Sequence, residues 1–180
     1  SNAADDLQTA VATNTATFNA VADAEVSKAK PTTNLGASKE LGSHGDPLRR
    51  AFLRFSVAGL SGKVTRARVR CYATNGSVNA PAIYSTSNAW SESSITWNNQ
   101  PAASGGALSD VGAVGFNVWV EFDVTKKVAG NGSYDFVLIP TSTDSLVCNS
   151  REASSNRPQL VVTTETEIAT DPPPSTGRRW

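Results

Sequence analysis

The sequence predicts an all-β fold, a two-sheet antiparallel β-sandwich of the jelly-roll type. Three observations support this class. Val, Thr, Ser, Ala, Asn and Gly dominate and methionine is absent, a composition that favours strands and turns over helices. Apolar and polar residues alternate along several segments, as they do in half-buried strands. Turn signals separate these segments at intervals of about ten residues, without intervening helical patterns.

Composition narrows the class of protein further. A chain of 180 residues can bury a core without help from metals or several disulfides. Its 16 basic and 16 acidic side chains balance and 39% of the residues are hydrophobic, which excludes a disordered or membrane-spanning chain. Low lysine and glutamate content is common in secreted proteins of polysaccharide-rich habitats, so we expect an extracellular location.

We expect three segments along the chain. Residues 1–14 are expected to be a tag remnant and a loose arm, because Ser1-Asn2-Ala3 is typical of a cleaved expression tag. Residues 15–164 are predicted to form the sandwich. Residues 165–180 are expected to be a Pro/Thr-rich linker, stiff over Asp171–Thr176. Trp180 at its end indicates either the edge of a further module or a disordered tail.

The first half of the sandwich is predicted to contain six strands, at residues 15–18, 23–26, 38–41, 50–57, 64–74 and 81–90. In the fourth strand the apolar face consists of Ala51, Leu53, Phe55 and Val57. In the fifth strand it consists of Ala67, Val69, Cys71 and Ala73. The strands are separated by turn signals at Pro31–Gly36, Gly42–Pro47, Gly59–Gly62 and Asn75-Gly76.

The second half is predicted to contain five strands, at residues 107–114, 118–124, 134–140, 146–151 and 159–163. A single helical turn is expected at residues 125–129, and Asn131-Gly132 marks another tight turn. The strand at 134–140 is strongly apolar.

The stretch Trp90–Pro101 holds two of the four tryptophans. Each indole can bury a large apolar area, while its N–H needs an acceptor that Glu92, Thr96 or Asn98 can supply. The stretch is interpreted either as a structural corner, where the chain passes from one sheet to the other, or as a platform on which sugars stack.

Two cysteines, Cys71 and Cys148, lie on alternating segments and are expected to point inward. In an oxidising compartment they would form one disulfide, worth about 4–5 kcal/mol by the chain-entropy argument. Otherwise they are two buried thiols that behave as small hydrophobic groups.

Basic residues are concentrated in one region. No acidic residue lies between Asp46 and Glu92, whereas seven basic residues do: Arg49, Arg50, Arg54, Lys63, Arg66, Arg68 and Arg70. Arg66, Arg68 and Arg70 recur at every second position, so a strand projects all three from one face. If the strand of Arg50 and Arg54 pairs beside it, five guanidinium groups share one surface.

Guanidinium groups bind carboxylates through two parallel hydrogen bonds, and a uronic acid polymer carries one carboxylate per sugar. The residues predicted to bind this ligand are Arg50, Arg66, Arg68, Arg70 and Tyr72. The alternative is a solvated face, or arginines paired with Glu121, Asp123 and Glu152. Arg54 is expected to be the most structural of the set, paired with Glu152 or Asp123.

A calcium site is a further candidate, because Asp23, Asn34 and Asp46 lie near predicted turns and calcium prefers oxygen ligands. The alternative for these residues is ordinary turn capping. No cofactor is otherwise required. His44 is the only histidine, and no G-x-S-x-G, P-loop, H-E-x-x-H or C-x-x-C motif is present, so we predict a non-catalytic chain.

Eight segments together resemble one known family. They are Ala22–Val26, Pro31–Gly36, Phe52–Phe55, Ala67–Arg70, Trp90–Pro101, Asp123–Thr125, Ser150–Ala153 and Pro158–Val162. In this order they resemble the DNRLRE domain, which overlaps carbohydrate-binding module family ninety-six. The resemblance implies a β-sandwich module of secreted bacterial proteins that sits beside a catalytic domain, and characterised members bind alginate. Cys71 and Cys148 replace core Leu and Phe of that family, which supports a buried pair.

We therefore predict a carbohydrate-binding module that holds an acidic polysaccharide, such as alginate, for a covalently linked secreted enzyme. The alternative is a structural or adhesive spacer without a glycan ligand. Nucleic acid is not an expected partner, because the basic region lacks lysines and a recognition helix. A membrane partner is not expected either.

Overall fold

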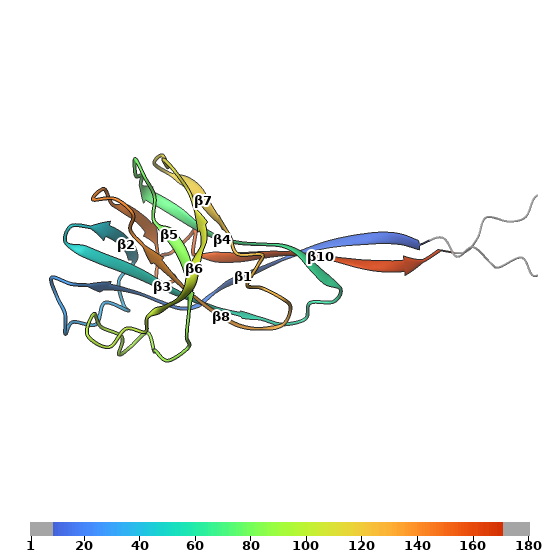
Figure 1. Ribbon diagram of the computed structural model, residues 1–180, viewed down its shortest axis with the longest axis horizontal. Coiled ribbons are helices and arrows are strands. Elements are labelled where there is room, and N and C mark those ends of the chain that lie inside the picture. Colours follow the sequence, from blue (N-terminus) through green and yellow to red (C-terminus); the bar gives the residue numbers. More distant parts are fainter. Residues whose placement is uncertain (1–8, 171–180) are drawn as a thin grey trace, which may run out of the picture.

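The computed structural model describes residues 9–170, which form ten strands and no helix. The strands are β1 (Thr9–Ser27), β2 (Glu40–Gly45), β3 (Leu48–Val57), β4 (Lys63–Asn75), β5 (Ala82–Thr86), β6 (Ala103–Asp110), β7 (Val118–Asp123), β8 (Gly132–Ile139), β9 (Leu146–Asn149) and β10 (Gln159–Ala169). All the strand pairs are antiparallel (Figure 1). The predicted fold class is confirmed.

Two sheets form the sandwich. In sheet A, β10 lies between β1 and β4, β4 also pairs with β7 and β9, and β9 pairs with β2. In sheet B, the order is β1, β3, β8, β5, β6. β1 contributes to both sheets, since it pairs with β10 up to Asn19 and with β3 from Ala20. β2 likewise pairs first with β9 and then with β3, so the sheets are joined at two places.

The main core fills the space between the sheets. The inner faces of β3 and β4 are the alternating sets predicted from the sequence, and all eight residues of these sets are buried. Phe55, Phe122 and Phe136 are completely buried, and the rings of Phe55 and Phe136 lie 6.3 Å apart. The predicted helical turn is present as a single hydrogen-bonded turn, in which Val128 N–H donates to the Val124 carbonyl at 3.3 Å.

β1 and β10 are longer than the sequence pattern indicates. Beyond the body of the sandwich they form a two-stranded ribbon, paired from Thr9 with Ala169 to Asn14 with Thr164 (Figure 1). The expected loose arm is therefore wrong for residues 9–14, and strand replaces the expected linker at 165–169. The ribbon is exposed to solvent over these residues, so no hydrophobic face reveals it in the sequence. The expected tag remnant and the Pro-rich segment lie outside the described residues.

A second, smaller core lies on the outer face of sheet B. The segment 87–102 crosses this face and buries Trp90 and Ile95 against Phe52, Ala24 and Val137. The rings of Phe52 and Trp90 lie 5.7 Å apart. The tryptophan stretch is thus structural, but it does not form a corner between the sheets. It covers an apolar patch that Phe52 creates on the outward face of β3.

The cysteines are both buried, as predicted, and both are free thiols. The register places Cys148 opposite Ala73 and not opposite Cys71, so the two cysteines form a diagonal pair on neighbouring strands. The predicted disulfide is absent from the structure. Contact with the Cys71 thiol, together with burial, raises the pKa of the Cys148 thiol.

Phe52→Ala tests the second core. We expect this substitution to lower the free energy of unfolding by about 3–5 kcal/mol, because it removes the ring on which Trp90 packs. Urea unfolding measures the change. Val78→Ala, at a side chain that is 75% exposed, is the control and should change stability by less than about 0.5 kcal/mol. A loss below about 1 kcal/mol for Phe52→Ala would show that segment 87–102 is held by other contacts.

Candidate functional site

The predicted arginine row lies on the outer face of sheet A. Arg66, Arg68, Arg70 and Tyr72 alternate with the buried residues of β4, as expected. The neighbouring strand β7 carries Glu121 and Asp123, two of the carboxylates that the sequence offered as partners for these arginines. Arg68 Nη1 lies 2.5 Å from Glu121 Oε2, and Arg70 Nε lies 3.9 Å from Glu121 Oε1. One carboxylate therefore partly neutralises two of the three arginines.

Aromatic residues complete this face. The Arg70 guanidinium lies 4.1 Å from the centre of the Trp119 ring, and Tyr72 meets the same ring edge-on at 5.5 Å. The pKa of Asp123, on the same strand, is lowered mainly by the N–H and hydroxyl of Thr125 and to a smaller extent by the charge of Arg66. The outer face of β4 and β7 thus mixes positive, negative and aromatic groups.

Arg50 and Arg54 are not part of this face. β3 pairs with β1, β2 and β8 in sheet B, so the prediction of five guanidinium groups on one surface is wrong. The loop after β3 carries the chain across to the other sheet before β4 begins, whereas the prediction required the two strands to be neighbours. The guanidinium groups of the two strands accordingly lie on opposite outer faces of the sandwich.

Arg54 is structural, as expected, although its partner is neither Glu152 nor Asp123. Its Nε donates to Asp135 Oδ1 at 2.7 Å, and its guanidinium lies 4.6 Å from the centre of the Trp90 ring. Trp90 Nε1 donates to the same carboxylate oxygen at 2.8 Å. Because Asp135 is buried, this network fixes segment 87–102 on sheet B.

Arg50 has a different environment. Its guanidinium lies 5.1 Å from the centre of the Trp97 ring, and its Nη1 donates to Gln100 Oε1 at 3.2 Å. Within the described residues 9–170, Arg50 forms no salt bridge. Burial lowers the pKa of its guanidinium. We call Arg50, Trp97 and Gln100 the Arg50 site. The sequence singled out Trp97 as part of the tryptophan stretch, but it did not show that Arg50 is its neighbour.

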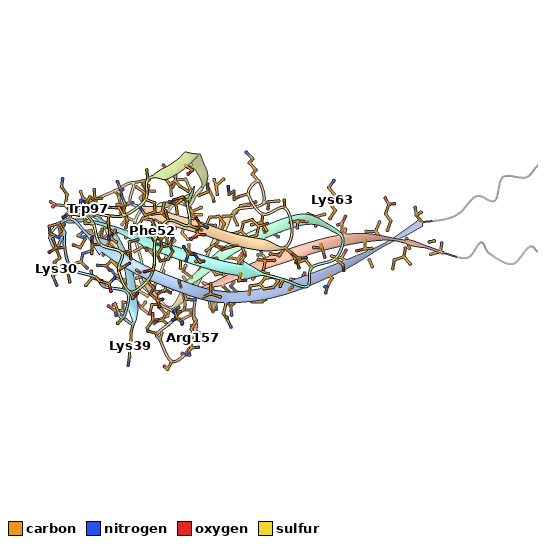
Figure 2. The ribbon with its side chains drawn as sticks, turned by 90° about the horizontal axis from the view of Figure 1, so that it is seen from below. Lys30, Lys39, Phe52, Lys63, Trp97 and Arg157 are labelled. Carbon is orange, nitrogen blue, oxygen red and sulfur yellow. The ribbon has the colours of Figure 1, made fainter. Side chains whose placement is uncertain are left out.

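Other charged groups lie at the same end of the molecule as the Arg50 site. Lys28 follows the end of β1, and its backbone N–H donates to the Leu48 carbonyl at 2.9 Å, so it lies next to the start of β3. Lys30 and Arg49 line a cavity of about 210 Å³ with Glu25 and Glu40. Glu25 pairs with Arg49 at 3.2 Å. Figure 2 shows Lys30 and Trp97 at the same end of the molecule, away from the ribbon.

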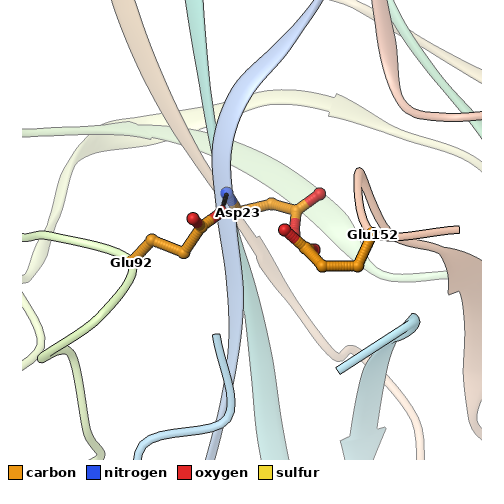
Figure 3. Close-up of side chains that lie close together, drawn as sticks. All are labelled: Asp23, Glu92 and Glu152. Atoms are coloured by element: carbon orange, nitrogen blue, oxygen red, sulfur yellow. Dashed lines mark hydrogen bonds between the residues drawn. The ribbon is translucent and has the colours of Figure 1, made fainter. Parts of the chain in front are cut away.

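Three carboxylates form a separate cluster. Asp23, Glu92 and Glu152 each place an oxygen within 4.8 Å of the others (Figure 3). Asn34 adjoins the cluster, since its Nδ2 donates to the backbone carbonyls of Glu92 and Ile95, each at 2.8 Å. Of the residues predicted to bind metal, Asp23 and Asn34 are therefore brought together. Asp46 is not, because it lies in the β2–β3 turn before the cis peptide to Pro47.

Comparison with known proteins identifies the family. Residues 14–164 match carbohydrate-binding module family 96. The chain belongs to this family. It is also 31% identical over 146 residues to a gellan lyase of a Bacillus species, an alignment that covers 72% of this chain. The module spans only 6% of the length of that relative.

Family 96 membership confirms the carbohydrate-binding resemblance inferred from the sequence and supports a non-catalytic module. The eight matching segments lie in the region that the family covers. Two of them contain Glu92 and Glu152, whose meeting with Asp23 is visible only in the fold. Within the described part of the module, no helix is long and apolar enough to cross a bilayer.

Asp135→Ala tests the structural assignment of Arg54. This substitution leaves a largely buried guanidinium and an indole N–H without their acceptor, so we expect a loss of about 3–5 kcal/mol in chemical denaturation. Glu121→Gln removes a carboxylate from a more exposed ion pair on sheet A and should cost less than about 1 kcal/mol. Equal losses for the two variants would contradict the difference in environment.

Proposed function

We propose that this module binds an acidic polysaccharide, alginate or a similar uronate polymer, and that Arg50 is its anchor. The observation that carries the proposal is the unpaired charge of Arg50. This guanidinium is half-buried beside Trp97, and its one described side-chain hydrogen bond goes to a neutral amide. A carboxylate would complete its interactions with a charge-assisted, two-point contact.

The surroundings of Arg50 suit a sugar that carries such a carboxylate. Trp97 is only partly buried, so it offers an aromatic surface next to the cation. Partial burial reduces the competition of water for the guanidinium, which strengthens its attraction for an anion. Lys28 and Lys30 are exposed and make no salt bridge within the described residues, so they can contact further carboxylates along a chain.

The position of the Arg50 site also favours a module that works beside another domain. Thr9 and Ala169 pair at the far end of the ribbon, and Lys30 and Trp97 lie at the opposite end of the body (Figures 1 and 2). A neighbouring domain joined through the ribbon would leave the Arg50 site open to a long polymer. A linked enzyme would then gain from a high local concentration of its substrate even if each contact were weak.

The comparisons support an anionic ligand and an extracellular enzyme. The family is one of carbohydrate-binding modules, and the relative is a lyase of gellan, an acidic polysaccharide. We therefore place the module in a secreted bacterial protein next to a catalytic domain. Alginate and gellan both provide the carboxylates that Arg50 requires.

The outer face of β4 remains a second candidate for the binding surface. Arg70 and Tyr72 lie beside Trp119, and Arg66 lies further along the same face of β4, so cations and aromatic rings are combined there too. Glu121 counts against this face, because it repels an anionic polymer and occupies Arg68.

A spacer without a glycan ligand is the second candidate function. The observation that favours it is the ribbon of β1 and β10, which holds the body away from the point where the chain continues.

Arg50→Ala tests the anchor. We expect about tenfold or greater weakening of alginate binding, because a charge-assisted hydrogen bond is lost. Affinity gel electrophoresis with alginate, gellan, pectin and a neutral glucan measures the effect. Lys63→Ala, at an exposed cation near the ribbon, is the matched control and should keep full affinity (Figure 2). Unchanged alginate retention by Arg50→Ala would remove the anchor, and no retention of the unmodified module on any polymer would favour the spacer.

Glu121→Gln separates the two faces. The substitution frees Arg68 and Arg70 from their carboxylate, so it would raise affinity if alginate lay on β4. With Arg50 as the anchor, we expect alginate affinity to stay within about twofold, since a charge change at this distance is largely screened by salt. Tighter binding by Glu121→Gln, measured on the same gels at 0.15 M salt, would move the site to sheet A.

A further inference from the structure

The cluster of Asp23, Glu92 and Glu152 is the strongest unexplained feature of the module. The three residues come from β1, from segment 87–102 and from the loop between β9 and β10. Their carboxylate oxygens approach within 4.8 Å (Figure 3). Like charges at this distance repel unless a positive group or a proton compensates them.

Arg151 compensates only part of this charge. Its Nε and Nη2 donate to the two oxygens of Glu92 at 2.6 and 2.9 Å, and its Nε also lies 3.2 Å from Glu152 Oε1. Three carboxylates and one guanidinium leave two negative charges in the cluster. Hydrogen bonds to Glu92 and the charge of Arg151 hold the pKa of Glu92 down, against the opposing effect of its burial.

Two oxygens in the cluster lack a donor. Only 1% of Asp23 is exposed. Its Oδ2 accepts a hydrogen bond from the backbone N–H of Arg151 at 2.7 Å, but its Oδ1 accepts none from the described residues. Glu152 Oε2 is also shielded from solvent and has no donor among the described residues. A buried acceptor without a partner is costly, so both oxygens indicate either a bound ion or a shared proton between the side chains.

We propose that Asp23 and Glu152, together with Glu92, bind one calcium ion. The available ligands are all oxygens, without histidine or cysteine, which favours a hard cation. A divalent ion matches the two uncompensated charges. Calcium fits better than magnesium because it accepts several carboxylate ligands in irregular geometry, whereas magnesium retains most of its water. This proposal rests on other residues than the Arg50 site and does not depend on glycan binding.

A cavity gives an ion access to two of the three carboxylates. A cavity of about 260 Å³ borders Glu92 and Glu152 and is also lined by Asn34 and Gly36. A side chain at Gly36 would collide with the Glu92 carbonyl, so only glycine allows this close approach. The ion would tie segment 87–102 to β1 and to the β9–β10 loop, and this segment also carries Trp97.

A shared proton is the competing way to neutralise the cluster. The pKa of Asp23 is raised to about 8, mainly by burial and to a smaller extent by the neighbouring Glu152 and Glu92. The hydrogen bond from the backbone N–H of Arg151 acts in the opposite direction. Asp23→Asn separates the two cases. It removes a calcium ligand, but it also supplies permanently the neutral group that a shared proton would provide.

The test combines calorimetry with thermal unfolding of the full module, first treated with chelator. Titration with CaCl2 should show one site per chain, and 2 mM calcium should raise Tm by about 5 °C or more relative to chelator. Asp23→Asn and Glu152→Gln should each lose this response. Asp46→Asn, which changes an acidic residue outside the cluster, should retain it.

Three results would overturn the proposal. The first is the absence of both calcium heat and a Tm shift in the unmodified module, together with an Asp23→Asn variant that matches or exceeds its stability in chelator. The second is a full calcium response in folded Asp23→Asn or Glu152→Gln. The third is an equal response to MgCl2 at the same concentration. If Asp23→Asn does not fold, the calorimetry of the unmodified module and of Glu152→Gln decides.

Discussion

The packing of segment 87–102 against the outer face of sheet B is the interaction on which both candidate sites depend. Trp90 covers Phe52, and its indole N–H shares the Asp135 carboxylate with Arg54. This contact and the burial of Ile95 fix the first half of the segment on the sheet. Glu92 is thereby placed against Asp23, and Trp97 is placed against Arg50. A segment without regular secondary structure thus positions a carboxylate cluster and a cation–aromatic pair.

The arginines of the module show how local partners decide the role of one residue type. Arg54 is held by a buried carboxylate and stabilises the second core. Arg68 and Arg70 share Glu121 on a more exposed face. Arg50 alone among these four makes no salt bridge within residues 9–170, and it lies beside the partly exposed Trp97. Availability for an external anion therefore follows from what each strand neighbour supplies.

Local patterns in the sequence predicted the fold well. The alternation along β3 and β4 identified their buried faces, because a strand buries every second side chain. The ribbon at residues 9–14 was missed, since it is exposed along its length and carries no such pattern. Its pairing with β10 depends on residues more than a hundred positions away.

The sites were harder to predict because they depend on which strands are neighbours. The row of Arg66, Arg68 and Arg70 was correctly placed on one face, but Arg50 was assigned to the wrong surface because β3 and β4 belong to different sheets. Asp23 was recognised as a metal candidate, whereas Glu92 and Glu152 lie 69 and 129 positions further along the chain. Short-range patterns contain no information on such contacts.

The most direct measurement is an NMR titration of the isotopically labelled module with a defined alginate oligosaccharide. We predict that the largest chemical-shift changes occur at the Arg50 guanidinium and the Trp97 indole, and that they weaken as salt is raised. Changes centred on Trp119 and Tyr72, or no changes at any oligosaccharide concentration, would contradict it.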